Sequence, residues 1–260
     1  MIRVIASDFD WTFGSWKGIP PENLRAVQRW RKAGNVFCIL TGREPQSAID
    51  VLQQYGGQYD YLLASSGTVQ MDQNNAILAE KRQHSGFLSE IAAYTLTLPV
   101  LNFRVFQGKE RYRLYIPGHE DDQEAGTCVP ADYDKLPYFN QFSLLFEKDE
   151  EAESYCQVLN DRYGSYIHAL RNGHCVDVPP AGWSKTEGLR WFLKNLGVPE
   201  KQAVTIGDNY NDIDMVTAFS GYAVESGVPE LKSAAHGVVK SVAELIDRLL
   251  EVNQREESSC

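Results

Sequence analysis

The chain has 260 residues, of which 43% are hydrophobic and 23% are charged, an ordinary balance for a folded globular protein. Its formal net charge of −10 argues against general nucleic-acid binding, which requires a basic surface. No run approaches the roughly 18 apolar residues of a membrane span, and Asp8 and Asp10 interrupt the N-terminal apolar run too early for a secretory signal. Because the five cysteines are scattered and form no CxxC pair, we expect reduced thiols in a cytoplasmic protein without membrane contact.

The first 64 residues alternate between short apolar runs and stretches in which apolar residues recur at helical spacing. The runs predict buried strands at 4–7, 36–40 and 61–64. The stretches between them predict helices at 20–34 and 45–56, each with proline near its start and glycine at its end. Strands and helices that alternate in this way predict a parallel sheet covered by helices.

The pattern changes beyond residue 68, where short strands and turns replace the regular alternation. We expect a hairpin of strands at 68–71 and 76–79, and an exposed, turn-rich loop at 118–137. The other predicted elements are helices at 85–96 and 149–163 and strands at 102–107, 111–116, 141–147, 165–170 and 175–178. This block therefore predicts a separate α+β lobe.

The parallel pattern returns after Pro179 and Pro180. The predicted elements are helices at 184–195, 211–218 and 242–252 and strands at 203–206, 222–224 and 237–239, with a frayed polar tail at 253–260. The fold class is thus α/β: a Rossmann-like parallel-sheet core from 1–82 plus 180–260, with an inserted α+β domain at 83–179.

Polar side chains cluster where the predicted parallel strands end. Asp8 and Asp10 follow the first strand, Thr41 follows the second, and Asp208 begins a segment that includes Asn211 and Asp212. Ligands bind at the carboxyl ends of strands in open α/β sheets, so these groups are expected to meet there with Lys185, which starts the returning helix. Clustered carboxylates resist ionisation unless a cation joins them, and oxygen ligands without His or Cys favour Mg²⁺.

This set of residues suggests phosphoryl transfer. A carboxylate can attack phosphorus to give an aspartyl phosphate, and Asp8 is the candidate nucleophile. Asp10, two residues on, could protonate the leaving alkoxide and then activate water. Lys185 and Thr41 would hold the transferring oxygens.

Four motifs in the chain resemble those of the haloacid dehalogenase superfamily. They are DFDWT at 8–12 (DxDxT), LTGR at 40–43, Lys185 within GWSKTEGL, and GDNYND at 207–212 (GDxxND). Their order, spacing and placement at strand ends agree, although each alone is a weak signal. The insert between the second and third motifs is similar to the cap of the Cof-type hydrolases, a group that resembles sugar-phosphate phosphatases.

The resemblance implies a role for each matched residue. Asp8 would be the nucleophile and a metal ligand, Asp10 the acid/base with its carbonyl on Mg²⁺, and Asp208 a metal ligand. Asp212 would support the metal, while Thr41, Gly42, Lys185 and Asn211 would bind the phosphoryl group. Trp11 stands where this group usually has glycine, so a positive φ there would be costly. Trp11 and Arg43 are candidates for contact with substrate or cap.

Other functions are less consistent with the pattern. A phosphotransfer receiver domain shares an acidic cluster, Thr and Lys, but places its acidic pair before the accepting Asp. A phosphohexomutase-like phosphotransferase shares the phosphoaspartate step, and a catalytically silent binding protein could share the fold. We expect a small phosphomonoester, a sugar phosphate or a phosphorylated cofactor, as substrate. No pattern in the chain indicates an oligomeric state.

Overall fold

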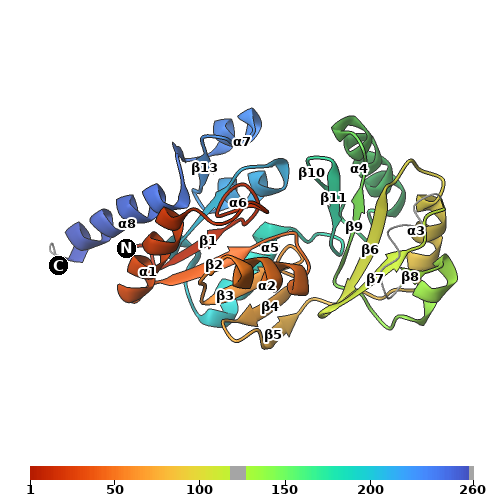
Figure 1. The fold of residues 1–260 in the computed structure, drawn as a ribbon, viewed down its shortest axis with the longest axis horizontal. Coiled ribbons are helices and arrows are strands. Elements are labelled where there is room, and N and C mark those ends of the chain that lie inside the picture. The colour runs from red at the N-terminus through yellow and green to blue at the C-terminus, as the bar shows by residue number, and fades with distance from the viewer. Residues whose placement is uncertain (118–126, 258–260) are drawn as a thin grey trace.

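The computed structural model describes residues 1–117 and 127–257, which form two sheets with helices around each (Figure 1). The larger sheet has eight strands in the order β14-β13-β12-β1-β2-β3-β4-β5. Their bounds are β1 Val4–Ser7, β2 Val36–Leu40, β3 Tyr61–Ala64, β4 Val69–Asp72, β5 Ile77–Glu80, β12 Ala203–Gly207, β13 Tyr222–Val224 and β14 Gly237–Val239. The six strands from β14 to β3 pair in parallel, and β4 and β5 add an antiparallel hairpin at one edge.

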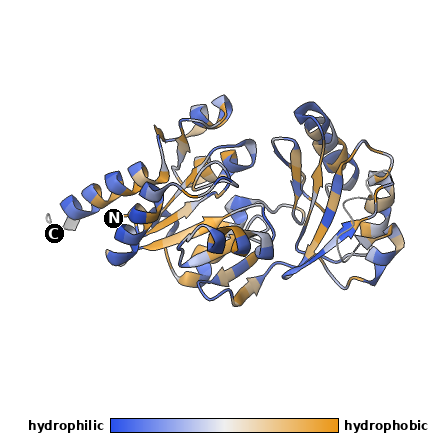
Figure 2. Ribbon diagram, in the orientation of Figure 1, coloured by the Kyte–Doolittle hydropathy of each residue, from blue (hydrophilic) through white to orange (hydrophobic). Residues whose placement is uncertain are grey.

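Alternation along the central strands gives the large sheet two apolar faces. Ile5 packs with the helices α1 (Pro21–Lys32), α2 (Pro45–Gln54) and α8 (Val242–Glu257). Val4 and Ala6, on the opposite face, pack with α5 (Lys185–Leu196), α6 (Ile213–Ala218) and α7 (Pro229–Ala234). Because both faces are covered, the strands read as continuous apolar runs, and Figure 2 shows the hydrophobic residues concentrated in them.

The register of the central strands brings the polar strand ends together. β1 lies between β12 and β2, with Ser7 opposite Ile206 on one side and Ile39 on the other. Asp8, Thr41 and Asp208 each lie one or two residues beyond these partners, at the carboxyl edge of the sheet. Parallel pairing thus gathers side chains that are up to 200 residues apart in the chain.

The second sheet, here called the cap sheet, has the strand order β10-β11-β9-β6-β7-β8. Its strands are β6 Asn102–Gln107, β7 Glu110–Leu114, β8 Thr127–Cys128, β9 Gln141–Leu145, β10 Leu170–Asn172 and β11 Cys175–Val178. A separate apolar cluster lies between it and the helices α3 (Leu88–Thr95) and α4 (Asp149–Tyr163). The domain boundaries predicted at 82/83 and 179/180 stay a prediction.

The strand predicted at 165–170 is wrong. Residues 164–166 form a turn and Ile167 makes an isolated bridge to Pro180; the strand β10 covers Leu170–Asn172 instead. Gly173, with a φ of 59°, turns β10 into the antiparallel partner of β11. The apolar residues before Leu170 fill the core of the cap without joining the sheet.

Other boundaries differ from the predictions in smaller ways. Within the predicted loop at 118–137, residues 127–128 form β8 and Pro130–Lys135 form a 3-10 helix, and 118–126 lie outside the described residues. The last helix continues to residue 257, so most of the tail expected to fray is helical. The predicted helix at 211–218 begins with a 3-10 turn at Tyr210–Asp212, and α7 was not predicted. Among the described helices, none has the length and apolarity needed to cross a membrane.

Close packing at Gly188 fixes the position of α5 against the large sheet. A Cβ atom at Gly188 would lie 2.7 Å from the carbonyl oxygen of Ser66 and 2.8 Å from Cα of Gly67. Both contacts are with backbone, which cannot move aside as a flexible side chain could. We therefore expect Gly188→Ala to destabilise the protein by about 1–3 kcal/mol, although alanine is the better helix former.

Urea unfolding followed by circular dichroism would measure this change. The control is Asn195→Ala on the exposed side of the same helix, which should alter the unfolding free energy by less than about 0.5 kcal/mol. A Gly188→Ala protein as stable as the wild type would show that α5 does not depend on this contact.

Candidate active site

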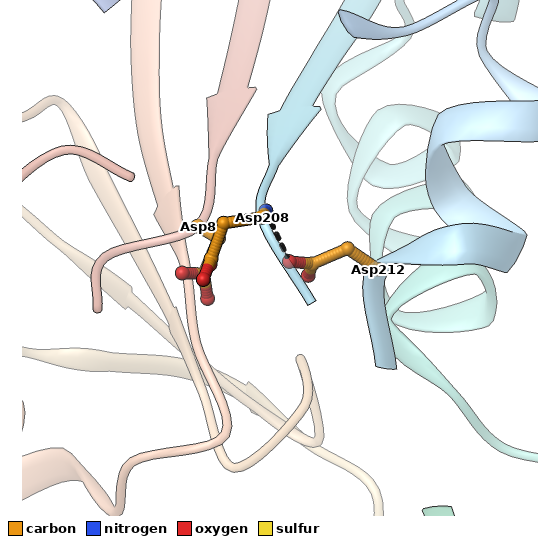
Figure 3. Close-up of side chains that lie close together, drawn as sticks. All are labelled: Asp8, Asp208 and Asp212. Carbon is orange, nitrogen blue, oxygen red and sulfur yellow. Dashed lines mark hydrogen bonds between the residues drawn. The ribbon is translucent and has the colours of Figure 1, made fainter. Parts of the chain in front are cut away.

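Three carboxylates and one ammonium group meet at the carboxyl edge of the large sheet. Asp8, Asp208 and Asp212 each place a carboxylate oxygen within 4.8 Å of the others. Lys185 Nζ donates to Asp8 Oδ1 and to Asp212 Oδ1, at 2.6 Å in both cases. Figure 3 shows the Asp8 and Asp208 carboxylates pointing into the same space, while Asp212 reaches back from the following helix.

Asp212 supports the site and faces it less directly than the other two acids. Its Oδ2 accepts hydrogen bonds from the backbone N–H groups of Asp208, at 3.0 Å, and Asn209, at 3.2 Å. Its other oxygen is bound by Lys185. Because both of its oxygens accept hydrogen bonds, Asp212 links the loop after β12 to Lys185.

Burial dominates the protonation behaviour of the cluster. It raises the pKa of Asp8 well above its ordinary value, against the lowering effect of Lys185. Burial, with the Asp212 carboxylate, raises the pKa of Asp208 to about 7. Burial alone would lower the pKa of Lys185, but the charges of Asp212 and Asp8 outweigh it, and the net shift is upward. The cluster thus combines three buried or partly buried acids with one ammonium group.

The donor set fits a hard divalent cation. Asp8 and Asp208 offer carboxylate oxygens to a common point, and neither sulfur nor imidazole is among the cluster. Thr12 Oγ1 donates to Asp208 Oδ1 at 3.0 Å and fixes the orientation of that carboxylate. Oxygen ligands of this kind suit Mg²⁺, which the acidic cluster could hold.

Asp10 lies outside the carboxylate cluster and pairs with Arg43. Arg43 Nε donates to Asp10 Oδ2 and its terminal nitrogen to Asp10 Oδ1, both at 2.7 Å, in a bidentate pair. This hydrogen bonding, against a smaller effect of burial, raises the pKa of Arg43. Arg43, expected as a contact with substrate or cap, is thus engaged by the candidate acid/base.

The backbone at Trp11 takes the left-handed conformation, in which a residue other than glycine is strained. Its φ is 63°, and its N–H donates to the carbonyl oxygen of Gly14 at 2.7 Å. A non-glycine residue held in this region costs on the order of 1–3 kcal/mol. The indole is 55% exposed, so core packing does not offset that cost.

A cleft of about 660 Å³ opens between the strand ends and the cap sheet. On the core side it is lined by Asp8, Asp10, Trp11, Trp16, Thr41, Gly42, Arg43, Asp208 and Asn211. On the cap side the lining includes Asn102, Arg104, Ser143, Cys175 and Asp177, which face it from β6, β9 and β11, together with Arg111 from β7. Thr41 is buried at the end of β2, where its Oγ1 accepts from the N–H of Arg43 at 3.1 Å.

Asp177 is a residue of this site that the sequence analysis missed. It lies on β11 of the cap sheet, yet its Oδ2 accepts from Asn211 Nδ2 of the large-sheet half at 3.3 Å. A Cβ atom at Gly42 would overlap the same oxygen, so a side chain there would displace the Asp177 carboxyl group. Burial raises the pKa of Asp177. Asn211, expected to bind phosphate, thus contacts the cap in this structure.

Comparison with known proteins gives a consistent result. Residues 5–246 match the family model of haloacid dehalogenase-like hydrolases. A phosphoglycolate phosphatase of Pyrobaculum aerophilum is 33% identical over 240 residues, which cover 91% of this chain and 89% of the relative. A 5-amino-6-(5-phospho-D-ribitylamino)uracil phosphatase of Escherichia coli is 23% identical over 268 residues, covering 96% and 97%.

Solved structures share the fold over nearly the whole chain. A haloacid dehalogenase-like hydrolase from B. subtilis superposes with a TM-score of 0.82 at 17% identity, covering 95% of this chain and all of that one. A haloacid dehalogenase subclass IIB sugar phosphatase gives a TM-score of 0.78 at 16% identity, covering 96% and 99%. The predicted α/β fold class is confirmed.

The raised pKa values predict how Mg²⁺ stabilises the protein at different pH. An acid whose pKa is raised on folding favours the folded state below that pKa, so Asp208 reduces metal-free stability as pH rises from about 4 to about 7. A cation binds the ionised folded form and removes this loss. We expect Mg²⁺ to raise the melting temperature more at about pH 7.5 than at about pH 5.5.

Thermal unfolding with and without Mg²⁺ at the two pH values would measure the difference. Asp208→Asn should abolish it, whereas Asp50→Asn, on the exposed side of α2, should not. An equal effect of Mg²⁺ at both pH values would contradict the assignment of the cluster as a cation site.

Proposed function

We propose that this chain, which belongs to the haloacid dehalogenase-like hydrolase family, is a Mg²⁺-dependent phosphatase that hydrolyses small phosphomonoesters through a phosphoaspartate on Asp8. The observation that supports this most directly is the Asp8 carboxylate itself. It is buried at the base of the cleft, its Oδ1 is held by Lys185, and Asp208 lies beside it. Asp8 and Asp208 would hold the metal ion, which when bound would reduce the repulsion between carboxylate and phosphoryl oxygens.

The residues of the cleft can divide the reaction into two displacements. In the first, an Asp8 oxygen forms a bond to phosphorus as the ester bond breaks, and Asp10 donates a proton to the leaving alkoxide. In the second, Asp10 takes a proton from water as the water oxygen attacks phosphorus and the Asp8–phosphorus bond breaks. Lys185 and Thr41 would donate hydrogen bonds to the phosphoryl oxygens as their charge redistributes.

The Asp10–Arg43 ion pair adds a condition to this scheme. The Arg43 guanidinium binds both oxygens of the Asp10 carboxylate and so holds them turned toward Arg43. For Asp10 to deliver a proton, the pair must open or shift when substrate fills the cleft. Arg43 would then be released near the phosphate, where its charge favours an anionic substrate.

The charged lining and the size of the cleft support a small, anionic metabolite as the substrate. Arg104 and Arg111 line its cap side, where Arg111 also pairs with Glu44 at 3.5 Å. Its volume of about 660 Å³ lies in the range of small-molecule sites. The relatives act on phosphoglycolate and on a phosphoribityl-substituted uracil by their names, and for this chain we propose a sugar phosphate or phosphorylated cofactor.

Two other functions use the same fold and can be separated by product analysis. A phosphohexomutase-like phosphotransferase would return isomerised sugar phosphate in place of free phosphate. A catalytically silent binding protein would release neither product. A screen of metabolite phosphomonoesters, with and without Mg²⁺, distinguishes these cases from hydrolysis.

Asp8→Asn tests the covalent step. The amide is a poor nucleophile, so we expect phosphate release to fall at least about 10³-fold, with no phosphoenzyme trapped by rapid acid quench and mass spectrometry. Asp50→Asn makes the same chemical change on an exposed helix and should retain activity within about twofold. Turnover by Asp8→Asn at the wild-type rate would exclude Asp8 as the nucleophile.

A further inference from the structure

We propose that Trp11 and Trp16 form an aromatic clamp that binds a ring in the alcohol part of the substrate. This inference rests on the proposed phosphatase function and narrows its substrate class to phosphate esters of ring-bearing alcohols. The shared chemistry is packing of a ring face against indole, which both a sugar ring and a heteroaromatic ring can provide.

The two tryptophans are exposed in the same cleft as the nucleophile. Trp11 is 55% exposed and Trp16 is 64% exposed, and both line the cleft that contains Asp8. Neighbouring aromatic residues of the same loop behave in the opposite way, because Phe9 and Phe13 are fully buried in the core. Two of the four aromatic side chains of this loop thus pack in the core, and the other two line the cleft.

Local hydrogen bonds hold the loop in this arrangement. The N–H of Trp11 donates to the carbonyl oxygen of Gly14, and the hydroxyl of Tyr55 donates to the carbonyl oxygen of Trp16, each at 2.7 Å. Lys17 Nζ lies 5.1 Å from the centre of the Trp16 ring, which orients that indole by a cation–π contact. Ordered backbone thus presents both indoles before any substrate arrives, which lowers the entropic cost of binding.

The cost of the arrangement at Trp11 indicates a function outside folding. A large apolar side chain is kept in water, and its backbone has a φ of 63°, a region that glycine adopts without strain. Neither property contributes to the packing of the loop, which depends on Phe9 and Phe13. A ring bound against the indole would recover the exposed apolar surface when the substrate binds.

The position of the pair also determines which part of a substrate it can reach. Asp8, Asp208 and Lys185 provide the phosphoryl end of the cleft. Trp11 and Trp16 line the same cleft without belonging to this group of charged residues, so we assign them to the alcohol portion. A two-carbon alcohol offers no ring face to them, whereas a hexose or a heteroaromatic alcohol does.

Non-hydrolysable ligands test the clamp without requiring turnover. Calorimetry would compare a hexose phosphonate, benzylphosphonate and the acyclic ethylphosphonate, each in the presence of Mg²⁺. We expect the wild type to bind at least one ring-bearing ligand about tenfold or more tightly than ethylphosphonate. The hexose and benzyl arms show which ring the clamp prefers.

Trp11→Gly and Trp16→Ser should each reduce the ratio of the affinity for the ring-bearing ligand to the affinity for ethylphosphonate by about fivefold or more. Glycine suits the φ at position 11, so the melting temperature of Trp11→Gly should not fall, which separates loss of a ligand contact from loss of folding. The matched control is Tyr166→Ser, which removes an exposed aromatic side chain outside the cleft and should leave the ratio unchanged.

The outcomes distinguish this inference from the proposed function. A wild type that binds ring-bearing and acyclic phosphonates equally, or Trp variants that keep the wild-type ratio, would overturn the clamp even if phosphate release is observed. Selective binding of rings that both Trp variants lose would support it even if the phosphate-release screen fails. In that case the phosphatase proposal alone would be rejected.

Discussion

The site depends on the two buried hydrogen-bonded ion pairs that Lys185 makes with Asp8 and Asp212. These residues come from three parts of the chain that meet only because β1 and β12 are parallel neighbours and α5 packs beside them. Burying charges is costly unless they are paired, so each contact requires the others to be in place. The close approach of Gly188 to Ser66 and Gly67 keeps α5 where Lys185 can serve both acids. Close packing of α5 against the sheet therefore determines where the Lys185 ammonium group lies relative to the two acids.

The cap sheet adds a further carboxyl group to this acidic cluster. Asp177 brings a further buried carboxyl group from β11 to the edge of the cluster, next to Gly42 and Asn211. The same sheet contributes Arg104 and Arg111 to the lining of the cleft, and Arg111 pairs with Glu44. The cap sheet therefore contributes an acidic group, Asp177, at its contact with the core, and two basic groups, Arg104 and Arg111, to the lining of the cleft.

The sequence predicted the parts of the site that follow from regular structure. Asp8, Thr41 and Asp208 come at strand ends, and parallel strands end at one edge, so their meeting was foreseeable; the family prediction is likewise confirmed by the model match over 5–246. Asp177 was not foreseeable in this way, because an alternating strand does not reveal which face looks toward the other domain. The strand wrongly placed at 165–170 had a different cause. Apolar residues there bury against the cap helices without joining a ladder, and periodicity alone does not distinguish the two.

The loop after β1 shows how tertiary structure gives consecutive residues unrelated tasks. The side chain of Asp10 turns to Arg43, that of Trp11 to the open cleft, and that of Thr12 to Asp208. Such divergence within three residues requires a tight backbone turn, and the positive φ at Trp11 provides it. Glycine would form the same turn with less strain but would leave that part of the cleft without a side chain. A strained, exposed tryptophan at this position is therefore the feature of the loop that its packing does not explain.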